Sequence, residues 1–498
     1  MVHNLIRGGD WFLIVLVMAG AVPELAAAWQ FLLVAVHFWR NHYAACEPTF
    51  PRTAILIPAW NEAAVIGASI DRLMALEYPR DRLRIFLVDD ASTDQTPAVA
   101  KAKEAQYPGN VVHLRRDQGG QGKAHTLNHG LSIIMRDDWM EALLITDADV
   151  IFEPDSLRKM TRHLADPQVG AVTAYIKEGS RPGNYLTRFI GYEYVTAQAA
   201  ARRGQNVLGA IACLAGGAQL HSRANLVELG GRIDTSSLAE DTFTTFETQL
   251  RGRRVVFEPH ARCWAEEPDS IGGLWKQRLR WARGNVQVTL RYRKLWFRPQ
   301  RGHRLGSVTF GVFWFCLFLQ PLFMITSSAS LVGLYFADTA DAWMTFRLLW
   351  IANAVGYIFI TGFALLIDVP TARHAWRQGL MFPGVVNVAV IGYTCFPRLF
   401  RDIVRRLFAV AHLSLQAHKG WIIIFIYAWL SAAMAVAYLA KAAEPHRFGR
   451  FISTVLVYLV GYGPLLCACT FASYVKELRG AEMKWDKTEK TGKVTIPT

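Results

Sequence analysis

Two carboxylates, Asp147 and Asp149, directly follow residues 143–146, an apolar run with the length and composition of a buried strand. Carboxylate oxygens are hard ligands, and they suit Mg²⁺ or Mn²⁺ that is bound together with the phosphates of a substrate. A D-x-D sequence is common by chance, but its place at the end of a strand favours a functional role. This pair therefore indicates a metal-assisted reaction on a phosphate-bearing substrate.

A second acidic pair, Asp89 and Asp90, directly follows the apolar residues 84–88. In this position the two carboxylates can accept hydrogen bonds from a base or a ribose. The other interpretation is structural, because residues 89–94 read Asp-Asp-Ala-Ser-Thr-Asp and such residues are typical of turns. The residues alone leave both interpretations open.

A third acidic pair, Glu240 and Asp241, precedes a helical stretch with apolar residues. A carboxylate beside a bound sugar donor can act as the general base on an acceptor hydroxyl. Two acids at the start of a helix also favour the positive end of the helix dipole. In isolation, this pair favours the structural interpretation.

Glycine-rich sequences occur at two places. Residues 119–123 read Gly-Gly-Gln-Gly-Lys, which lacks the spacing and the Ser or Thr of a P-loop, so ATP hydrolysis is not expected. A flexible loop of this kind can still bring Lys123 to a diphosphate. Gly216 and Gly217 predict either a close approach of the backbone to a ligand or a crowded turn.

Residues 277–281 read Gln-Arg-Leu-Arg-Trp and place an amide, guanidinium groups and an indole near one end of a helical turn. Arg binds phosphate through paired hydrogen bonds, and Trp offers a flat apolar face to a pyranose ring. These residues therefore suit a site that holds a diphosphate and a sugar together. The alternative is an amphipathic helix on a membrane surface, with its Arg side chains directed to lipid phosphates. The carboxylates upstream favour the first interpretation.

The elements that must position these residues alternate between strand and helix signals. Asn61 is predicted as the cap of a helix that has Ile66, Ile70 and Leu73 on one face. Strands alternating with helices indicate an α/β fold, a mostly parallel sheet with helices on both faces. In such sheets ligands bind beyond the carboxyl ends of the strands, where the first two acidic pairs fall. The predicted strands are residues 53–58, 84–88, 111–114, 143–146 and 169–176.

The composition is that of a membrane protein with an inserted soluble domain. The 498 residues are 52% hydrophobic and only 19% charged, and the apolar surplus lies at the two ends of the chain. The net charge of +14 falls largely on Arg and Lys beside apolar runs, as on the cytoplasmic flanks of membrane spans, and not on a nucleic-acid surface. The seven cysteines are scattered, so neither zinc nor a disulfide framework is expected.

About five membrane spans are predicted from length and apolarity. Arg40 and the pair Arg373 and Arg377 follow segments whose ends are assigned to the cytoplasm. Residues 380–418 read as a re-entrant or surface-lying stretch, because a span there would place four Arg residues outside. The predicted spans are residues 11–39, taken as one kinked span in preference to two short ones, 308–336, 343–367, 421–439 and 451–475.

The resulting organisation has four parts. Residues 1–49 form an N-terminal span and linker, residues 50–300 a cytoplasmic catalytic domain, residues 301–478 membrane and interfacial helices, and residues 479–498 a cytoplasmic tail.

Five short motifs, in their order and approximate spacing, resemble glycosyltransferase family 2. They are similar in particular to its membrane-embedded processive members, the cellulose, hyaluronan, chitin-oligosaccharide and poly-N-acetylglucosamine synthases. The likeness covers residues 50–300 closely and the membrane layout loosely, and residues 485–490 resemble a C-terminal Trp-x-Lys-Thr signature of related bacterial enzymes. The motifs are Pro-Ala-Trp-Asn-Glu at 58–62, Asp-Asp-Ala-Ser at 89–92, Asp-Ala-Asp at 147–149, Glu-Asp at 240–241 and Gln-Arg-Leu-Arg-Trp at 277–281.

This resemblance implies a GT-A fold and a donor site for a UDP-sugar. It implies that Asp89 and Asp90 contact the uridine, with help from Glu62 and Lys123. It implies that a divalent cation, Mg²⁺ or Mn²⁺, lies on the diphosphate. The residues that the resemblance assigns to the diphosphate and its metal are Asp147, Asp149 as the metal ligand, Gln277 and Arg280.

The resemblance also implies an acceptor site. Asp241, with Glu240 beside it, is the base that deprotonates the acceptor hydroxyl. Trp281 stacks under the terminal sugar of the growing chain, and Gly217 lies with it in the acceptor-binding part. Residues 274–284 look most like those of the N-acetylglucosamine polymerases, which favours that sugar.

The implied function is an inverting, metal-dependent transferase that uses UDP-GlcNAc or UDP-Glc. It extends a β-linked polysaccharide and passes it through a channel formed by its own membrane helices. The implied location is the bacterial inner membrane, and the implied partners are the UDP-sugar, the growing polysaccharide, the lipid bilayer and accessory export subunits, but no nucleic acid. Two alternatives stay open: a non-processive transferase of the same fold that adds one sugar to a membrane lipid, and a membrane scaffold with a relic domain.

Overall fold

A computed structural model describes residues 2–39, 46–370, 373, 379, 381–410, 415–483, 492 and 494. Arg40, Arg377 and residues 485–490, which enter the predictions above, lie outside this described part. The chain divides into two compact units. The helical unit combines Met1–Phe31 with Val312–Lys476, and the sheet unit combines Leu32–Gly311 with Glu477–Thr498. The predicted domain limits near residues 50 and 300 both fall within the sheet unit.

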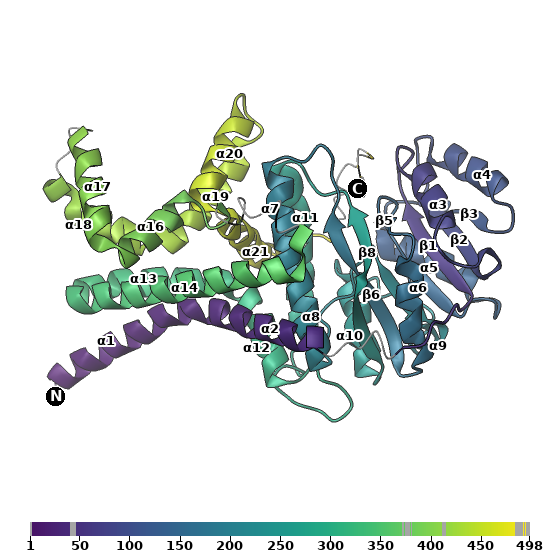
Figure 1. Ribbon diagram of the computed structural model, residues 1–498, viewed down its shortest axis with the longest axis horizontal. Coiled ribbons are helices and arrows are strands. Elements are labelled where there is room, and N and C mark those ends of the chain that lie inside the picture. Colours follow the sequence, from purple (N-terminus) through teal and green to yellow (C-terminus); the bar gives the residue numbers. More distant parts are fainter. Residues whose placement is uncertain are drawn as a thin grey trace. The chain divides into compact units, whose positions relative to one another are not determined.

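The sheet unit is built on one eight-stranded mixed sheet (Figure 1). Its order is β3-β2-β1-β4-β7-β6-β8-β5. The pairs β1–β2, β2–β3, β1–β4 and β6–β8 are parallel, whereas β4–β7, β6–β7 and β5–β8 are antiparallel. The strands are β1 (Thr53–Ala59), β2 (Leu83–Asp89), β3 (Val111–Arg115), β4 (Ala142–Ile145), β5 (Ile151–Phe152), β6 (Val169–Glu178), β7 (Gln219–Ser222) and β8 (Arg254–Ala265).

The five predicted strands correspond to β1, β2, β3, β4 and β6, with ends that differ by at most two residues. Strands β5, β7 and β8 were not predicted. β5 has only two residues, and β7 contains the polar residues Gln219 and His221, so neither forms an apolar run. β8 contains Pro259, and its register against β6 shifts between Ala174 and Tyr175. These strands take their place in the sheet from their neighbours and not from a local apolar pattern.

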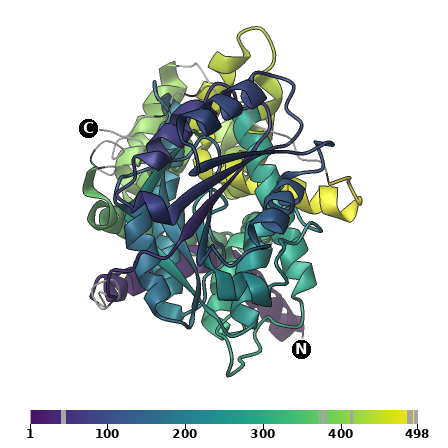
Figure 2. The ribbon, with the colours of Figure 1, turned by 90° about the vertical axis from the view of Figure 1, so that its right-hand side faces the viewer.

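Helices cover both faces of the sheet, and the side chains of β1 alternate between two cores. Ile55 and Ile57 join the core beneath α3, α4 and α6, and Ala54 and Leu56 join the core beneath α5 and α9. Figure 2 turns the β1–β3 side of the sheet toward the viewer. The helices of the sheet unit include α3 (Ile66–Met74), α4 (Thr96–Gln106), α5 (Lys123–Ile134), α6 (Ser156–Thr161), α7 (Tyr185–Glu193), α8 (Ala200–Leu208), α9 (Arg223–Glu228), α10 (Glu240–Leu250) and α11 (Ile271–Arg291).

The prediction of Asn61 as a helix cap is wrong. Helix α3 begins at Ile66 and has no side-chain cap. Asn61 has a left-handed backbone with φ of 54°, a conformation that Asn tolerates better than most residues. Its Oδ1 accepts a hydrogen bond from the Thr93 backbone N at 2.8 Å, and its own N donates to Ser92 Oγ at 2.9 Å. Asn61 therefore joins the loops that follow β1 and β2.

Apolar helices make up most of the rest of the chain. Within the described residues, Gly9–Trp39 and Thr339–Ile367 are each long and apolar enough to cross a membrane, and three bent helix pairs raise the number to five if each pair is one span. The bends are 68° between α12 and α13, 74° between α18 and α19, and 101° between α20 and α21. The helices are α1 (Val2–Met18), α2 (Val22–Trp39), α12 (Val308–Phe318), α13 (Gln320–Ala337), α14 (Thr339–Ile367), α16 (Val385–Cys395), α17 (Pro397–Val410), α18 (Leu415–Tyr427), α19 (Trp429–Ala443), α20 (Gly449–Val460) and α21 (Tyr462–Leu478).

The connection predicted between the second and third spans is shorter than expected. The break between α13 and α14 is the single residue Asp338. Its side chain accepts hydrogen bonds from Ala340 N at 2.7 Å and Asp341 N at 3.1 Å. An Asp in this position satisfies the free N–H groups of the following helix, so α14 begins at once.

Candidate active site

Lys123 is the first residue of α5 and lies at the centre of an acidic cluster. Its Nζ is 2.5 Å from Asp147 Oδ1 and 4.0 Å from Glu240 Oε1, and it donates a hydrogen bond to the Gly216 carbonyl at 3.0 Å. Lys123 is 7% exposed, so water and salt screen these charges weakly. The fold thus gathers predicted site residues from three distant parts of the sequence around one ammonium group.

Gly216 and Gly217 lie between the carboxylates of this cluster. A Cβ at Gly216 would be 3.0 Å from Asp241 Oδ2 and 3.4 Å from Lys123 Nζ. A Cβ at Gly217 would be 3.1 Å from Asp147 Oδ2. Any larger residue would press on the acids, so these glycines permit a close approach of the backbone to the acidic side chains.

Glu240 and Asp241 are the first two residues of α10, where acids also favour the helix dipole. The Thr242 N–H donates to Asp241 Oδ1 at 2.7 Å. This hydrogen bond orients the carboxylate and leaves Oδ2 on the side of Gly216 and Lys123. The structure therefore accommodates the structural interpretation and the chemical interpretation of this pair at the same time.

The charges of the cluster shift two pKa values. Burial opposes the charge on Lys123, but the surrounding carboxylates, Asp147 first, outweigh it and raise the pKa of Lys123. Burial and the neighbouring Asp241 raise the pKa of Glu240, while Lys123 and Arg280 act in the opposite direction. Lys123 is therefore a permanent cation, and Glu240 takes up a proton more readily than an ordinary Glu.

Asp89 lies at the end of β2 and is fully buried. Its Oδ1 accepts a hydrogen bond from Ser92 N at 2.8 Å, and its Oδ2 accepts one from Arg115 Nη1 at 2.9 Å. Burial would raise the pKa of Asp89, but His113, Ser92 and Arg115 together lower it. The carboxylate stabilises the turn after β2, and its predicted contact with the uridine stays a prediction.

Asp90 connects the end of β2 to the glycine-rich loop. Its Oδ2 accepts a hydrogen bond from Gly120 N at 2.9 Å, and its Oδ1 forms an ion pair with Arg116. Glu62 lies in the adjacent loop after β1, where its backbone N donates to Thr96 Oγ1 at 2.8 Å. The predicted uridine-contacting residues therefore lie in neighbouring loops beyond the ends of β1 and β2.

Helix α11 carries the whole motif at 277–281 and packs against the segment that precedes Glu240. A Cβ at Gly284 would be 3.2 Å from the Ala239 backbone N, so only glycine allows this approach. Gln287 Oε1 accepts a hydrogen bond from Leu238 N at 3.0 Å. The same packing brings Arg280 close enough to act on the pKa of Glu240. Arg280 thereby connects the motif electrostatically to the acidic cluster.

Two carboxylates from outside the motif hold its first half. Gln277 Nε2 donates to Glu267 Oε2 at 3.0 Å, and Gln277 Oε1 accepts from Arg278 Nη1 at 3.1 Å. Arg278 Nη2 donates to Glu193 Oε2 at 2.8 Å. The guanidinium carbon of Arg278 lies 4.1 Å from the centre of the Trp281 ring. Trp281 is half-buried, and the prediction that it stacks on a sugar stays a prediction.

Glu193, Glu267 and Arg278 had no predicted role. Arg278 lies within the motif and Glu267 ten residues before Gln277, so both positions were close to a recognised signal. The signal at Glu193 is a carboxylate within a helix whose other residues are largely buried, including Ile190. Pairing such a residue with its partner 85 positions away requires the tertiary structure.

A divalent cation fits the donor chemistry of the cluster. Asp149 is 9% exposed and lies between β4 and β5, next to Asp147. Among the described residues, no group of three or more His, Cys, Asp or Glu side chains is arranged to hold a metal ion. A cation at Asp149 would therefore take most of its ligands from substrate phosphates and water, which is the usual arrangement for Mg²⁺ in phosphate-transfer sites.

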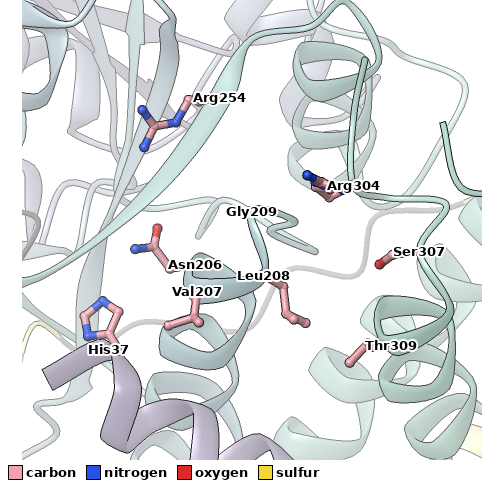
Figure 3. A pocket seen from close by; sticks show the side chains of 9 residues that line it. All are labelled: His37, Asn206, Val207, Leu208, Gly209, Arg254, Arg304, Ser307 and Thr309. Atoms are coloured by element: carbon pink, nitrogen blue, oxygen red, sulfur yellow. The ribbon is translucent and has the colours of Figure 1, made fainter. Parts of the chain in front are cut away.

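A separate cavity of about 570 Å³ lies elsewhere in the sheet unit (Figure 3). None of its lining residues belongs to the predicted site. The cavity lies beside the ends of α2 and α8. We therefore do not place the reaction in this cavity. It is lined by His37, Asn206, Val207, Leu208, Gly209, Arg254, Arg304, Ser307 and Thr309.

Residues 51–284 match the family described as glycosyltransferase like family 2, a stretch that contains every predicted site residue. Among solved structures, the chain is similar to a mannosyltransferase from Pyrobaculum calidifontis in complex with GDP-Man and Mn²⁺. The TM-score is 0.50 at 22% identity, over 76% of this chain and 99% of that one. The family match shows a glycosyltransferase, and the similarity to the solved structure shows a GT-A fold. The catalytic domain of this chain is a glycosyltransferase family 2 domain.

Two curated relatives are also similar to this chain. A protein of Bacillus subtilis strain 168 named as a probable glycosyltransferase is 29% identical over 321 residues, which are 64% of this chain and 74% of that protein. Poly-beta-1,6-N-acetyl-D-glucosamine synthase of Staphylococcus aureus strain COL is 32% identical over 237 residues, 47% of this chain. The chain spans only 55% of the synthase's length, so its substrate and product do not follow from this similarity.

Proposed function

We propose that this protein is an inverting, metal-dependent transferase that uses a UDP-sugar, UDP-GlcNAc or UDP-Glc, to extend a β-linked polysaccharide. We further propose that the catalytic domain lies in the bacterial cytoplasm and that the chain passes the polymer through its membrane helices. The observation that carries the proposal is the cluster in which Lys123 lies 2.5 Å from Asp147 and 4.0 Å from Glu240. This cluster places a fixed cation and several carboxylates in one weakly screened site.

In the proposed reaction, an acceptor hydroxyl oxygen attacks the anomeric carbon of the donor sugar. The new glycosidic bond forms as the bond to the diphosphate oxygen breaks, the hydroxyl proton passes to Asp241, and UDP leaves. Attack from the face opposite the leaving group inverts the configuration. Asp241 suits the base because Thr242 orients its Oδ1 while Oδ2 lies beside Gly216. Geometry of this kind supports general base catalysis.

Negative charge develops on the leaving diphosphate. Lys123 and Arg280 are the cations of this chain that act on the acidic cluster, and both suit the stabilisation of that charge. A divalent cation held by Asp149, with Asp147 beside it, would supply further positive charge on the diphosphate. Fixed charges in a weakly screened site usually contribute the largest part of a rate enhancement.

The alternative is a non-processive transferase that adds one sugar to a membrane lipid. The two functions share the donor chemistry, so they differ in the product. This chain is similar to a poly-N-acetylglucosamine synthase over 237 residues, which supports a polymer as the product. The experiment that tests the proposal is incubation of the purified protein in nanodiscs with Mg²⁺ or Mn²⁺ and a panel of radiolabelled UDP-sugars, followed by assay of released UDP and sizing of the product.

Long polymer from one UDP-sugar supports the proposal. A labelled lipid with a single sugar supports the alternative, and the absence of any UDP release contradicts both. Asp241→Asn is expected to lower transfer by roughly 100- to 10,000-fold. Asp81→Asn is a matched control, because Asp81 is an exposed carboxylate of the same unit that no step of the proposed reaction uses. Unchanged transfer in Asp241→Asn would show that another group is the base.

A further inference from the structure

The indole of Trp281 is covered on one face by Arg278, whose guanidinium carbon lies 4.1 Å from the ring centre. This distance is typical of a cation stacked on an aromatic ring. Trp281 is half-buried, so it retains accessible surface. One face of the indole is therefore backed by protein and the other is the better candidate to meet a ligand.

Arg278 is itself held in a fixed position. It is 6% exposed, its Nη2 donates to Glu193 Oε2 at 2.8 Å, and its Nη1 donates to Gln277 Oε1 at 3.1 Å. The planar guanidinium has its donors in a rigid fork, so two directed hydrogen bonds fix its plane. Fixing this plane fixes the surface on which Trp281 rests.

The carboxylate of Glu193 comes from a part of the fold with unusual backbone geometry. Glu193 is the last residue of α7, and a π-helical turn at Tyr194–Ala199 follows directly. The Tyr194 hydroxyl donates to Glu267 Oε1 at 2.5 Å, and Glu267 in turn holds Gln277. Single π-helical turns occur frequently at functional sites. At this turn the consecutive residues Glu193 and Tyr194 both support the motif of α11, Glu193 through Arg278 and Tyr194 through Glu267.

Stability alone explains this arrangement poorly. Removing the charges of Arg278 and Glu193 from water costs free energy that their attraction recovers only in part. A well-packed apolar pair would stabilise this interior as well or better. Buried ion pairs of this kind are retained in some proteins because they specify one orientation of their neighbours. The neighbour whose orientation depends on Arg278 is Trp281.

We propose that Glu193 and Arg278 are positioning residues of the acceptor subsite, which fix the indole plane of Trp281 so that its open face stacks on the terminal pyranose of the acceptor. This inference rests on the proposed function, because it takes Trp281 as the residue that contacts the acceptor sugar. A pyranose presents apolar C–H groups on one face, and an aromatic ring matches that face only when its plane is held parallel to the sugar. A free indole would lose that match to side-chain motion.

The consequence is a selective effect on the acceptor. Loosening the indole weakens binding of the acceptor and leaves the donor residues Lys123 and Asp147 in place. The KM for a soluble oligosaccharide acceptor is therefore expected to rise by roughly tenfold, and the polymer to become shorter. In Glu193→Gln, which keeps the hydrogen bond from Arg278 to Gln277, the KM for the UDP-sugar and the slow release of UDP without acceptor stay within about twofold of the wild type.

The test uses four variants of the full chain in nanodiscs. Glu193→Gln is the least intrusive, because it removes one charge and leaves Gln277 untouched. Arg278→Lys keeps the charge for Glu193 but loses the planar surface. Arg278→Met removes the ion pair between Arg278 and the buried Glu193, so this variant is expected to lower the melting temperature. The double variant Glu193→Gln with Arg278→Met removes both charges and is expected to recover that temperature.

Two results together support the positioning role. The double variant recovers its melting temperature but keeps a raised acceptor KM, and Arg278→Lys also has a raised acceptor KM. A merely structural ion pair would give a double variant with normal stability and normal acceptor KM. A matched control is the double variant Glu228→Gln with Arg253→Met, which removes an ion pair of 2.6 Å far from the motif in sequence. This control is expected to leave both KM values unchanged.

Two results overturn the inference in distinguishable ways. In the first result, the wild-type protein extends the acceptor, and the acceptor KM is unchanged in Arg278→Lys and in the double variant. This result overturns the positioning role and leaves the proposed function intact. Wild-type protein that releases UDP but never extends any acceptor overturns the proposed function and the positioning role together.

Discussion

The ammonium group of Lys123 lies 2.5 Å from Asp147 Oδ1. This ion pair joins the first residue of α5 to the end of β4, and the burial of Lys123 keeps it out of bulk water. Two further acids, Glu240 and Asp241, contribute to the raised pKa of Lys123. Lys123 is therefore the cation around which these carboxylates are arranged.

Replacement of this cation is expected to damage stability and donor binding together. Lys123→Met removes the ammonium group that pairs with Asp147 and leaves Arg280 to act on Glu240. The Asp147 side chain is 40% exposed, so the loss of stability is expected to stay below the roughly 3–5 kcal/mol of a fully buried pair, and the pKa of Glu240 is expected to rise further. Differential scanning fluorimetry and the KM for the UDP-sugar measure the two effects. Lys101→Met, at an exposed position on α4, is the control, and a Lys123→Met protein with normal donor KM would contradict the assignment.

Addition of one methyl group at Gly216 is expected to lower kcat without unfolding the domain. The Cβ of Gly216→Ala would lie 3.0 Å from Asp241 Oδ2 and 3.4 Å from Lys123 Nζ, so both must shift. A displacement of catalytic groups by a fraction of an ångström to one ångström lowers kcat by roughly 10- to 100-fold. Steady-state kinetics at saturating donor measure the effect. Gly302→Ala, whose Cβ would meet nothing within 4 Å, is expected to behave as wild type.

Removal of divalent cations is expected to abolish transfer reversibly. Chelation with EDTA followed by gel filtration should eliminate UDP release, and Mg²⁺ or Mn²⁺ should restore it. Asp149→Asn is expected to raise the metal concentration for half-maximal activity by roughly 100-fold, since loss of even an outer partner of a metal ligand costs 10- to 100-fold. Full activity after chelation would exclude a metal role for Asp149. An unchanged melting temperature in Asp149→Asn shows that the variant loses activity through weaker metal binding and not through unfolding.

A buried carboxylate away from the site makes stability depend on acid pH. Burial would raise the pKa of Glu258, but hydrogen bonds with His163 and His260, at 2.7 Å and 2.8 Å, outweigh it and lower the pKa to about 2. Because the folded pKa lies below the ordinary value of 4.5, the ionised group stabilises the fold fully above that pH. Its contribution, about 3 kcal/mol, disappears as the pH falls from 4.5 toward 2.

The check is a comparison of melting temperatures for wild type and Glu258→Gln between pH 3 and pH 7. The variant is expected to melt at a lower temperature at neutral pH, and the gap should narrow below pH 4.5. A gap that is constant across this range would show that the ionised form of Glu258 contributes nothing specific.

Much of the fold could be predicted from local patterns. β1, β2 and β4 are apolar runs of central parallel strands, and such runs form the same element in almost any surroundings. β7 could not be predicted, because Gln219 and His221 are polar residues that become buried only through their sheet neighbours. The same limit applies to Asn61, whose preference for caps and for left-handed turns is a property of the residue alone. Which of the two it adopts depends on Ser92 and Thr93, in another loop.

The sequence by itself predicted which residues form the site. Asp147, Asp149, Lys123, Asp241 and the motif at 277–281 each have a side chain whose chemistry suits a nucleotide-sugar, and their order along the chain carries the family. These properties are local, because a carboxylate or an indole has the same chemistry wherever it lies.

Only the tertiary structure decided how these residues are held. The partners of Lys123, Gln277 and Arg278 lie 24, 10 and 85 residues away along the chain, and Glu193 carries no pattern that marks it as the partner of Arg278. Charge and hydrogen-bond energies fall steeply with distance in space, whereas sequence spacing says little about that distance once the chain has folded. The residue types therefore determine the chemistry of the predicted site, and the packing of the folded chain determines its geometry.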